Sequence, residues 1–385
     1  MIKRGDKRRS TIQRGYAMLG IIAAVGVATT AVVVTSLSAT AVRNEQGRRD
    51  SNALALAKQA LIASAASSNS RPGSLPCPDV DNDGLSDQVD NNAAAACTNL
   101  IGRLPWQTLA LSDLRDAAGE RLWYAVSANF QDISANRINA STVGQLIVRE
   151  GEQATTGVVA IITAPGKSLG SQRRDTAQIN SMANYLEGYS AENLTATLHA
   201  QDTAHNDQLA VITPADIFSL VERRVAKEVQ NSLQNYYLAV ANPTPYSLPY
   251  PAQTEVINDG NYSYPASVVA PPFSGSVLSG YLPSNDPTLV LPAWFSANRW
   301  YRVLNYRVDS NCVPSAVTAA TGTCGTATFT VSGYGVLIGG TAGVPPIGTM
   351  AMLGFNGVST AYSNFQSTLL NTTVQAQVQT QTQTP

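Results

Sequence analysis

The pattern of apolar positions begins with one long uncharged run, from Gly15 to Val42. As a helix rising about 1.5 Å per residue, this run would exceed the roughly 30 Å hydrocarbon core of a bilayer. The residues before it are basic, and basic flanks remain in the cytoplasm. These bases are Lys3, Arg4, Lys7, Arg8, Arg9 and Arg14. The pattern therefore predicts a transmembrane helix over residues 16–42, with a cytoplasmic N-terminus and the rest of the chain outside the cytoplasm.

Helical periodicity continues beyond the apolar run. Residues 43–66 lack proline and place Leu54, Leu61 and Ala65 near helical spacing. A proline-glycine pair at residues 72–73 then breaks the helix. We therefore expect one long helix, of which the second half lies outside the membrane segment.

Strand-like alternation follows this helix. Leu122, Tyr124 and Val126 alternate after a glycine-containing turn, and further strand-like runs occupy Gln145–Val148 and Val158–Thr163. We expect these segments to form a small antiparallel sheet.

A second helix is predicted from Thr213 onward. Thr213 is a candidate N-cap, Pro214 suits the first turn, and Asp216 places an acid in that turn. An apolar stripe then follows one face as far as Ala241, and Pro243 ends the helix. The stripe consists of Ile217, Leu220, Val221, Val225, Val229, Leu233, Tyr236, Tyr237 and Val240. We interpret it as a core-packing face rather than a groove for a partner.

Short motifs recur in the two halves of the chain. SLPCP at 74–78 is followed by LPW at 104–106 and LWYAV at 122–126. SLPYP at 247–251, LPAW at 291–294 and RWYRV at 299–303 repeat that order. The repetition predicts a duplicated helix-and-sheet unit. The Gln/Thr repeat at 371–385 has too little apolar surface to pack and is predicted to be disordered.

Composition and charge narrow the classes of partner. Charged residues make up 13% of the chain, below the roughly 25% of an average soluble domain. The net charge is −1, and most of the clustered bases precede the apolar run. The rest of the chain therefore has no basic stripe for nucleic acid, and we expect no nucleic-acid partner.

The four cysteines form two local pairs, Cys77 with Cys97 and Cys312 with Cys324. The sequence has no CxxC motif and no cysteine-histidine cluster of the kind that binds zinc. In an oxidising compartment, two local disulfides are the economical interpretation, and four buried thiols are the alternative.

The sharpest chemical motif is DVDNDGLSDQVD, residues 79–90, which lies between Cys77 and Cys97. Carboxylates occupy positions 1, 3, 5, 9 and 12 of a 12-residue loop, as Asp79, Asp81, Asp83, Asp87 and Asp90. Gly84 stands at position 6 and Leu85, which would offer its carbonyl, at position 7. This is the spacing of a calcium loop, so we predict a structural Ca²⁺ there.

Two features qualify the calcium motif. Asp90 replaces the usual bidentate glutamate, which predicts weak binding, in the ~10⁻⁴–10⁻³ M class. The stretch also resembles a single thrombospondin type 3 repeat rather than a helix–loop–helix site, because prolines and a polyalanine run flank it. A solvated acidic turn without metal is the alternative.

The start of the apolar run resembles the class III signal of type IV pilins and type II secretion pseudopilins. A short basic leader ends in Gly15, and the aromatic Tyr16 and an uninterrupted apolar helix follow. In that family a prepilin peptidase cuts after the glycine and methylates the new amine. The resemblance implies that Gly15 is the last leader residue and Tyr16 the first mature one. Gly20 stands where the family usually has glutamate, a departure shared by tip-like minor pseudopilins.

A second processing route remains open at the other end of the run. Ala39-Thr40-Ala41 is a signal-peptidase site of the A-x-A type, so cleavage after Ala41 is the alternative.

The resemblance, together with the repeated motifs, implies an α+β fold: a long N-terminal transmembrane stalk helix followed by two tandem pilin-like heads, each a helix packed on a small antiparallel sheet. The expected domains are a leader (1–15), the transmembrane half of the stalk (16–42), and the rest of the stalk with a first head and the calcium loop (43–212). A second helix with a β-rich head (213–370) and the disordered tail (371–385) follow. The expected location is single-pass in the inner (cytoplasmic) membrane, with the heads periplasmic or extracellular.

No catalytic constellation stands out in the sequence. Gly166-Lys167-Ser168 lacks the earlier glycine of a phosphate loop, and His199 and His205 lie in a polar stretch. The chain has no G-x-S-x-G motif. We expect a non-enzymatic protein without a small-molecule substrate.

These observations predict a minor pilin-like or pseudopilin-like subunit of a type IV pilus or type II secretion-like assembly, acting at the tip or in priming. Its expected partners are other pilin or pseudopilin subunits, through the N-terminal helix, with prepilin peptidase and membrane lipid. The alternative is a calcium-dependent surface adhesin or cargo-binding protein displayed on a membrane-anchored pilin scaffold.

Overall fold

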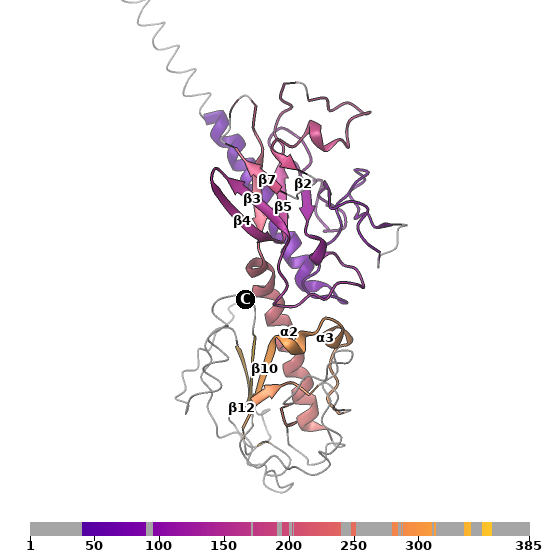
Figure 1. The fold of residues 1–385 in the computed structure, drawn as a ribbon, viewed down its shortest axis with the longest axis vertical. Helices are drawn as coiled ribbons and strands as arrows, with labels where there is room; N and C mark the ends of the chain where they lie inside the picture. The colour runs from indigo at the N-terminus through magenta and orange to yellow at the C-terminus, as the bar shows by residue number, and fades with distance from the viewer. Residues whose placement is uncertain are drawn as a thin grey trace, which may run out of the picture.

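The fold is taken from a computed structural model of the chain (Figure 1). The structure describes residues 41–89, 95–170, 172–190, 195–199, 202, 204–239, 248–251, 279–283, 286, 288–309, 312, 335–339 and 349–355. We call the described part of residues 41–212 the first unit, and the described part after residue 238 the second unit.

The N-terminal helix, residues 41–67, packs one face against the first unit. Its buried residues follow helical spacing, so they form a single stripe. They are Ala53, Leu54, Ala57, Leu61 and Ala65. The helix ends at residue 67. Just after it, Gly73 adopts a φ of +105° and its N–H donates to the carbonyl of Ala65 in the last turn. Its first nine residues, 41–49, are exposed or half-buried and contribute nothing to the core.

The stripe lies on an antiparallel sheet of order β1-β2-β5-β8. The strands are β1 (Ile101–Arg103), β2 (Trp123–Val126), β5 (Ala160–Ala164) and β8 (Gln208–Ile212). Successive side chains of a strand point to opposite faces. Tyr124 and Val126 accordingly share the core of the N-terminal helix, whereas Trp123 and Ala125 belong to a separate core on the other face.

A second sheet covers that other face, with the order β4-β3-β7-β6. Its strands are β3 (Leu146–Glu150), β4 (Gln153–Val158), β6 (Tyr189–Ser190) and β7 (Thr195–Leu198). β3 and β7 run parallel, and the other pairs are antiparallel. The first unit therefore has three layers: helix, sheet and sheet. Short 3-10 helices, η2 (Ala128–Phe130) and η3 (Met182–Asn184), lie in its loops.

Helix α2 (Pro214–Leu238) connects the two units, as Figure 1 shows. Thr213 caps it in a reciprocal capping box with Asp216, and proline opens it, as the sequence predicts. Lys58 of the N-terminal helix reaches this cap, because its Nζ lies 3.1 Å from Asp216 and donates to the Val211 carbonyl at 2.8 Å. The apolar face of α2 is core, also as predicted, although Leu220 is 41% exposed.

The second unit contains an antiparallel sheet of order β11-β12-β10-β9. Its strands are β9 (Ser279–Tyr281), β10 (Leu304–Val308), β11 (Gly335–Gly339) and β12 (Thr349–Phe355). Two short helices, α3 (Ala293–Ala297) and η4 (Trp300–Arg302), precede β10. Phe218 of α2 touches both units, because its ring lies 6.0 Å from that of Phe130 and 6.2 Å from that of Trp300. The described core is therefore continuous from one unit to the other.

The predicted fold class is wrong. We expected a transmembrane stalk followed by two heads, each a helix on one small antiparallel sheet. The first unit instead has two stacked sheets, one of them mixed, and the strand orders of the two units differ. The antiparallel sheet of the first unit follows chain order, whereas in the second unit β12 lies between β10 and β11.

The predicted location in the inner membrane also needs correction. Among the described residues, the structure contains no helix with the length and apolar character that a membrane crossing requires. The described part of the N-terminal helix carries Arg43, Glu45, Arg48, Arg49 and Asp50, and charged side chains are costly inside a bilayer. Residues 1–40, which include the leader and most of the predicted transmembrane segment, lie outside the described residues, as does the tail at 371–385.

Candidate metal centre

The aspartate loop starts on the edge of the first sheet. The Asp79 N–H donates to the Arg103 carbonyl at 2.9 Å, and the Arg103 N–H donates to the Asp79 carbonyl at 2.6 Å. This bridge attaches the loop to β1. The predicted disulfide between Cys77 and Cys97 is confirmed and closes the loop at its base.

Three carboxylates of the loop converge. Oxygen atoms of Asp79, Asp81 and Asp87 lie within 4.8 Å of one another. That separation is about twice a Ca²⁺–oxygen distance of roughly 2.4 Å, so all three can reach one calcium ion. The residues present therefore fit a hard cation.

Backbone N–H groups hold these carboxylates in place. Asp79 is fully buried, and its two oxygens accept from the N–H groups of Asn82 at 2.5 Å and Gly84 at 2.7 Å. Asp87 Oδ2 accepts from the Val80 N–H at 2.5 Å. A carboxylate has about four acceptor positions, so these bonds leave Asp79 and Asp87 with lone pairs for a cation.

Gly84 provides the sharp turn of the loop. It has a φ of +94°, and an added Cβ would lie 2.6 Å from the indole of Trp106. Both the backbone conformation and the close approach of the indole require glycine here. Gly84 is the predicted turn glycine, and the structure shows the steric reason for it.

The electrostatics of the loop favour a bound cation. Burial raises the pKa of Asp79 to about 6, the negative charges of Asp83 and Asp87 act in the same direction, and the N–H bonds from Gly84 and Asn82 oppose them. A divalent cation among these oxygens would offset both the burial cost and the mutual repulsion.

The remaining predicted ligands are not part of this cluster. Asp83 Oδ1 accepts from the Leu85 N–H at 2.7 Å, and the Asp83 carbonyl accepts from the Gln107 side chain at 2.5 Å. Asp90 lies outside the described residues. The structure therefore brings together positions 1, 3 and 9 of the predicted loop.

The other predicted sites have different outcomes. Cys312 is disulfide-bonded, and its expected partner Cys324 lies outside the described residues, as do Gly15 and Tyr16. His199 and His205 stack on each other with ring centroids 4.0 Å apart. A buried arginine beside the metal loop, Arg103, was missed, because no sequence motif marks it.

No family model, curated protein or solved structure matches this chain.

Proposed function

We propose that this protein is a non-enzymatic assembly subunit with the role of a minor pilin or pseudopilin, and that its aspartate loop holds a structural Ca²⁺. The observation that carries the proposal is the N-terminal helix. It packs its C-terminal half on a sheet and extends past that sheet with a part that contacts no core. Such a helix can join a second subunit without disturbing its own unit.

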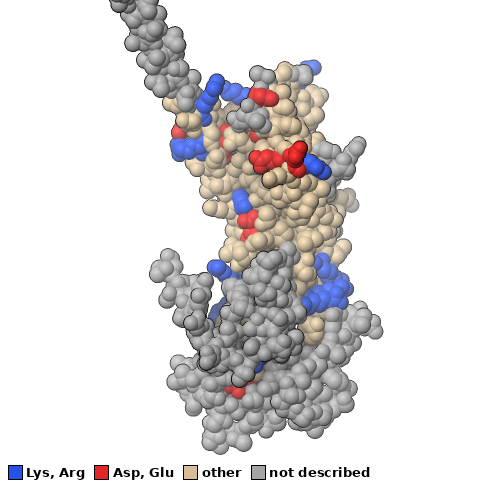
Figure 2. All heavy atoms as spheres, turned by 60° about the vertical axis from the view of Figure 1, so that its left-hand side comes forward, with Lys and Arg blue, Asp and Glu red and all other residues tan. Residues whose placement is uncertain are grey.

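The outer surface of the helix supports this role. Leu56 is 51% exposed and Val42 56% exposed, although both are apolar. Arg48 and Arg49 are each 64% exposed and pair with Glu45. Figure 2 shows basic side chains gathered where the helix enters the described part of the molecule. A mixed apolar and charged surface of this kind suits packing against another helix.

Calcium would act as a structural ion. The disulfide and the bridge from Asp79 to Arg103 both attach the loop to one corner of the first unit. A cation there would hold three repelling carboxylates together without taking part in a reaction.

The N-terminus of the mature protein tests the proposed role. Mass spectrometry of the protein purified from its native host should find Tyr16 as the first residue, because a pilin-type leader ends at Gly15. A mature protein that begins at Val42 would have lost the apolar segment, and the proposal would fail.

Photo-crosslinking tests the helix as the contact surface. A photoreactive residue in place of Leu56 should join the protein to a subunit that itself has a prepilin-type leader, identified by mass spectrometry. Val143, 49% exposed in the first unit, is the matched control position. Equal crosslinking from both positions would contradict the proposal.

Metal analysis tests calcium separately. The full chain should bind Ca²⁺ in equilibrium dialysis, Asp81→Asn should lose that binding, and Asp175→Asn, an exposed aspartate elsewhere, should keep it. Equal calcium content in all three proteins would remove the calcium part of the proposal and leave the assembly part standing.

A further inference from the structure

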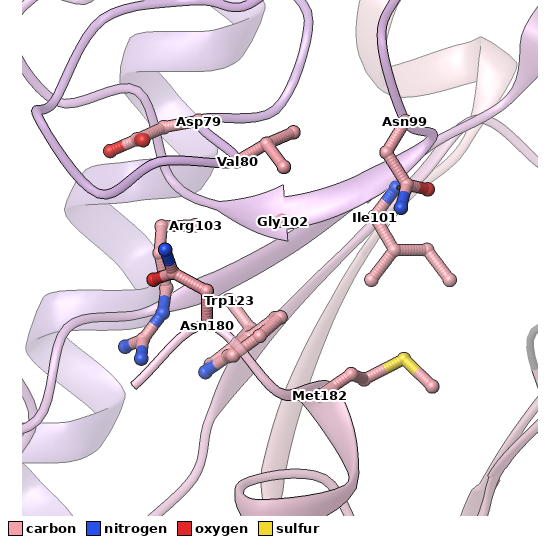
Figure 3. Close-up of a pocket in the computed structure, with 9 residues that line it drawn as sticks. All are labelled: Asp79, Val80, Asn99, Ile101, Gly102, Arg103, Trp123, Asn180 and Met182. Carbon is pink, nitrogen blue, oxygen red and sulfur yellow. Dashed lines mark hydrogen bonds between the residues drawn. The ribbon is translucent and has the colours of Figure 1, made fainter. Parts of the chain in front are cut away.

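A small cavity lies against β1 and the start of the metal loop, because Asp79 and Val80 are among the residues that line it. Its volume is about 150 Å³, and β1, Trp123 of β2 and the segment around Asn180 and Met182 form its walls (Figure 3). Asp79 and Val80 contribute to one wall, while the Asp79 carboxylate accepts hydrogen bonds from the N–H groups of Asn82 and Gly84 within its own loop. The cavity is therefore a neighbour of the metal centre and shares Asp79 with it as a lining residue.

The charged group at this cavity is Arg103. Its side chain is 3% exposed, and its guanidinium carbon lies 4.4 Å from the ring centre of Trp123 and 4.1 Å from that of Tyr185. The two aromatic rings hold the guanidinium plane by cation–π contacts. Burial lowers the pKa of Arg103, since the charged form has lost its water.

Arg103 has no counter-ion in the described part of the chain, because no carboxylate oxygen there forms a salt bridge with it. Its terminal nitrogens donate to two backbone carbonyls, of Ile179 at 2.7 Å and of Arg121 at 3.4 Å. Its Nε has no hydrogen-bond partner among the residues that the structure describes. A second arginine, Arg174, lies 4.5 Å from the Tyr185 ring centre, but it is paired with Glu120. Arg103 thus has no carboxylate in direct contact within the described part of the chain, and the charges of Glu120 and Asp79 act on it only from farther away.

A second donor next to the guanidinium is also without a partner. Trp123 is only 3% exposed, and its indole Nε1 is buried without a hydrogen bond to any of the described residues. Figure 3 shows the Arg103 guanidinium and the Trp123 indole close together below β1, with the Asn180 side chain beside them. Burying two unpartnered N–H donors, one of them on a guanidinium without a salt bridge, is costly, so the arrangement favours an acceptor that carries negative charge.

We propose that this cavity binds a carboxylate group, with Arg103 and the Trp123 indole as its donors. A carboxylate is planar, carries the missing charge and accepts two parallel N–H bonds from a guanidinium. The volume equals that of an engineered cavity of about 150 Å³ that accepts benzene, so the bound group is no larger than a short-chain acid or one terminal residue of a peptide.

Asn180 belongs to the wall of the cavity. It is exposed, and its side chain forms no hydrogen bond within the described part of the chain. The two donors lie behind this wall, so a carboxylate reaches them when the Asn180 side chain turns outward. This makes Asn180 the position at which the cavity can be blocked without touching either donor.

The test uses the indole signal of Trp123 in the full chain labelled with ¹⁵N-tryptophan. The sequence has four tryptophans, so Trp123→Phe assigns the signal. Sodium propionate, titrated at constant ionic strength, should move the Trp123 signal downfield to saturation, because the N–H gains an acceptor. Propionamide, a neutral molecule of the same shape, should leave the signal in place.

Two variants locate the site. Arg103→Lys keeps the positive charge but loses Nε and the planar set of guanidinium N–H donors, so it should weaken propionate binding at least tenfold. Asn180→Phe fills the cavity from an exposed position, so it should fold normally and weaken binding to the same extent. Ala177→Phe, an exposed change on the same segment, is the control and should bind like the unmodified protein.

The source of the carboxylate is distinguished by peptides. Acetyl-Ala-Ala with a free carboxyl end is compared with its amide. Binding of the acid more than tenfold tighter than propionate supports a chain terminus as ligand, and equal or weaker binding supports a free acid. An indole signal that none of these carboxylates shifts to saturation, or that shifts equally in Asn180→Phe, overturns the proposal.

Discussion

The Tyr124 hydroxyl on β2 donates a 3.1 Å hydrogen bond to the carbonyl of Pro76. The second unit contains the same pair, because Tyr306 on β10 donates at 3.0 Å to the carbonyl of Pro249. In both units the N–H of the leucine before that proline also donates to a backbone carbonyl beyond the strand. Leu75 donates to the carbonyl of Phe130, and Leu248 donates to that of Cys312. The Ser-Leu-Pro motif therefore attaches the segment after each helix to the sheet of its unit.

Removing either hydroxyl should destabilise the protein. Tyr124→Phe and Tyr306→Phe each leave a proline carbonyl without its partner, at a cost of about 1–2 kcal/mol in the free energy of unfolding. Urea denaturation measures this loss. Tyr189→Phe is the control, since its hydroxyl is buried without a partner and its loss should be neutral or stabilising. A loss for Tyr189→Phe as large as the other two would contradict the assignment.

Replacement of Gly84 should damage the metal loop. Gly84→Ala places a Cβ at positive φ and against Trp106, so calcium affinity should fall at least tenfold and the free energy of unfolding by about 2–3 kcal/mol. Gly119→Ala is a matched control, because Gly119 also has positive φ, +87°, but no atom lies within 4 Å of the added Cβ. Isothermal titration with Ca²⁺ and urea denaturation compare the two. Equal effects would show that the indole contact is unimportant.

Loss of the Cys77–Cys97 disulfide should weaken both the fold and the loop. The bond joins residues separated by 20 positions, and closing a loop of that size contributes about 3 kcal/mol by limiting the unfolded chain. The double variant Cys77→Ala with Cys97→Ala should lose that amount in urea denaturation and bind calcium more weakly. Unchanged calcium affinity would show that the bridge from Asp79 to Arg103 positions the loop without help.

The stability of the first unit should depend on pH through Asp207. Burial, followed by the charge of Glu187, raises the pKa of Asp207 to about 8 from 3.8. The unfolded chain releases this proton at lower pH than the folded protein, so the free energy of unfolding falls as the pH rises between these two values. Asp207→Asn removes that dependence and should be more stable than the unmodified protein at pH 8, by a few kcal/mol in order of magnitude.

The comparison is made by urea denaturation between pH 4 and pH 8. The advantage of Asp207→Asn should be small at the acidic end and grow with pH. Asp202→Asn is the control, because hydrogen bonding from Ala204 and the contact with His205 lower the pKa of Asp202. An advantage for Asp207→Asn that stays constant with pH would show that the carboxyl is ionised throughout.

The sequence alone located the elements that depend on neighbours along the chain. The capped start of α2 at Thr213 and the apolar stripe of the N-terminal helix follow from local spacing, which a helix imposes by itself. The same holds for the turn at Gly84 and for the short-range disulfide, because both partners lie within one loop.

Motif matching failed where the environment differed. Trp123 and Trp300 occupy similar sequence motifs, yet the first lies on β2 and the second begins the 3-10 helix η4. The sequence motifs pair Tyr124 with Tyr301, but it is Tyr306 whose hydroxyl donates to a proline carbonyl as that of Tyr124 does. Aromatic residues fit strands and short helices alike when buried, so tertiary packing decides between them.

Only the tertiary structure could decide which residues from distant segments meet. The second sheet of the first unit depends on β3 pairing in parallel with β7, which no local pattern encodes. The convergence of Asp79, Asp81 and Asp87 without Asp83 depends on how the loop is attached to β1. No sequence motif marks Arg103, and its burial between Trp123 and Tyr185 can be recognised only in the folded structure. Periodicity records which side of an element is apolar, whereas pairing and burial are properties of the folded whole.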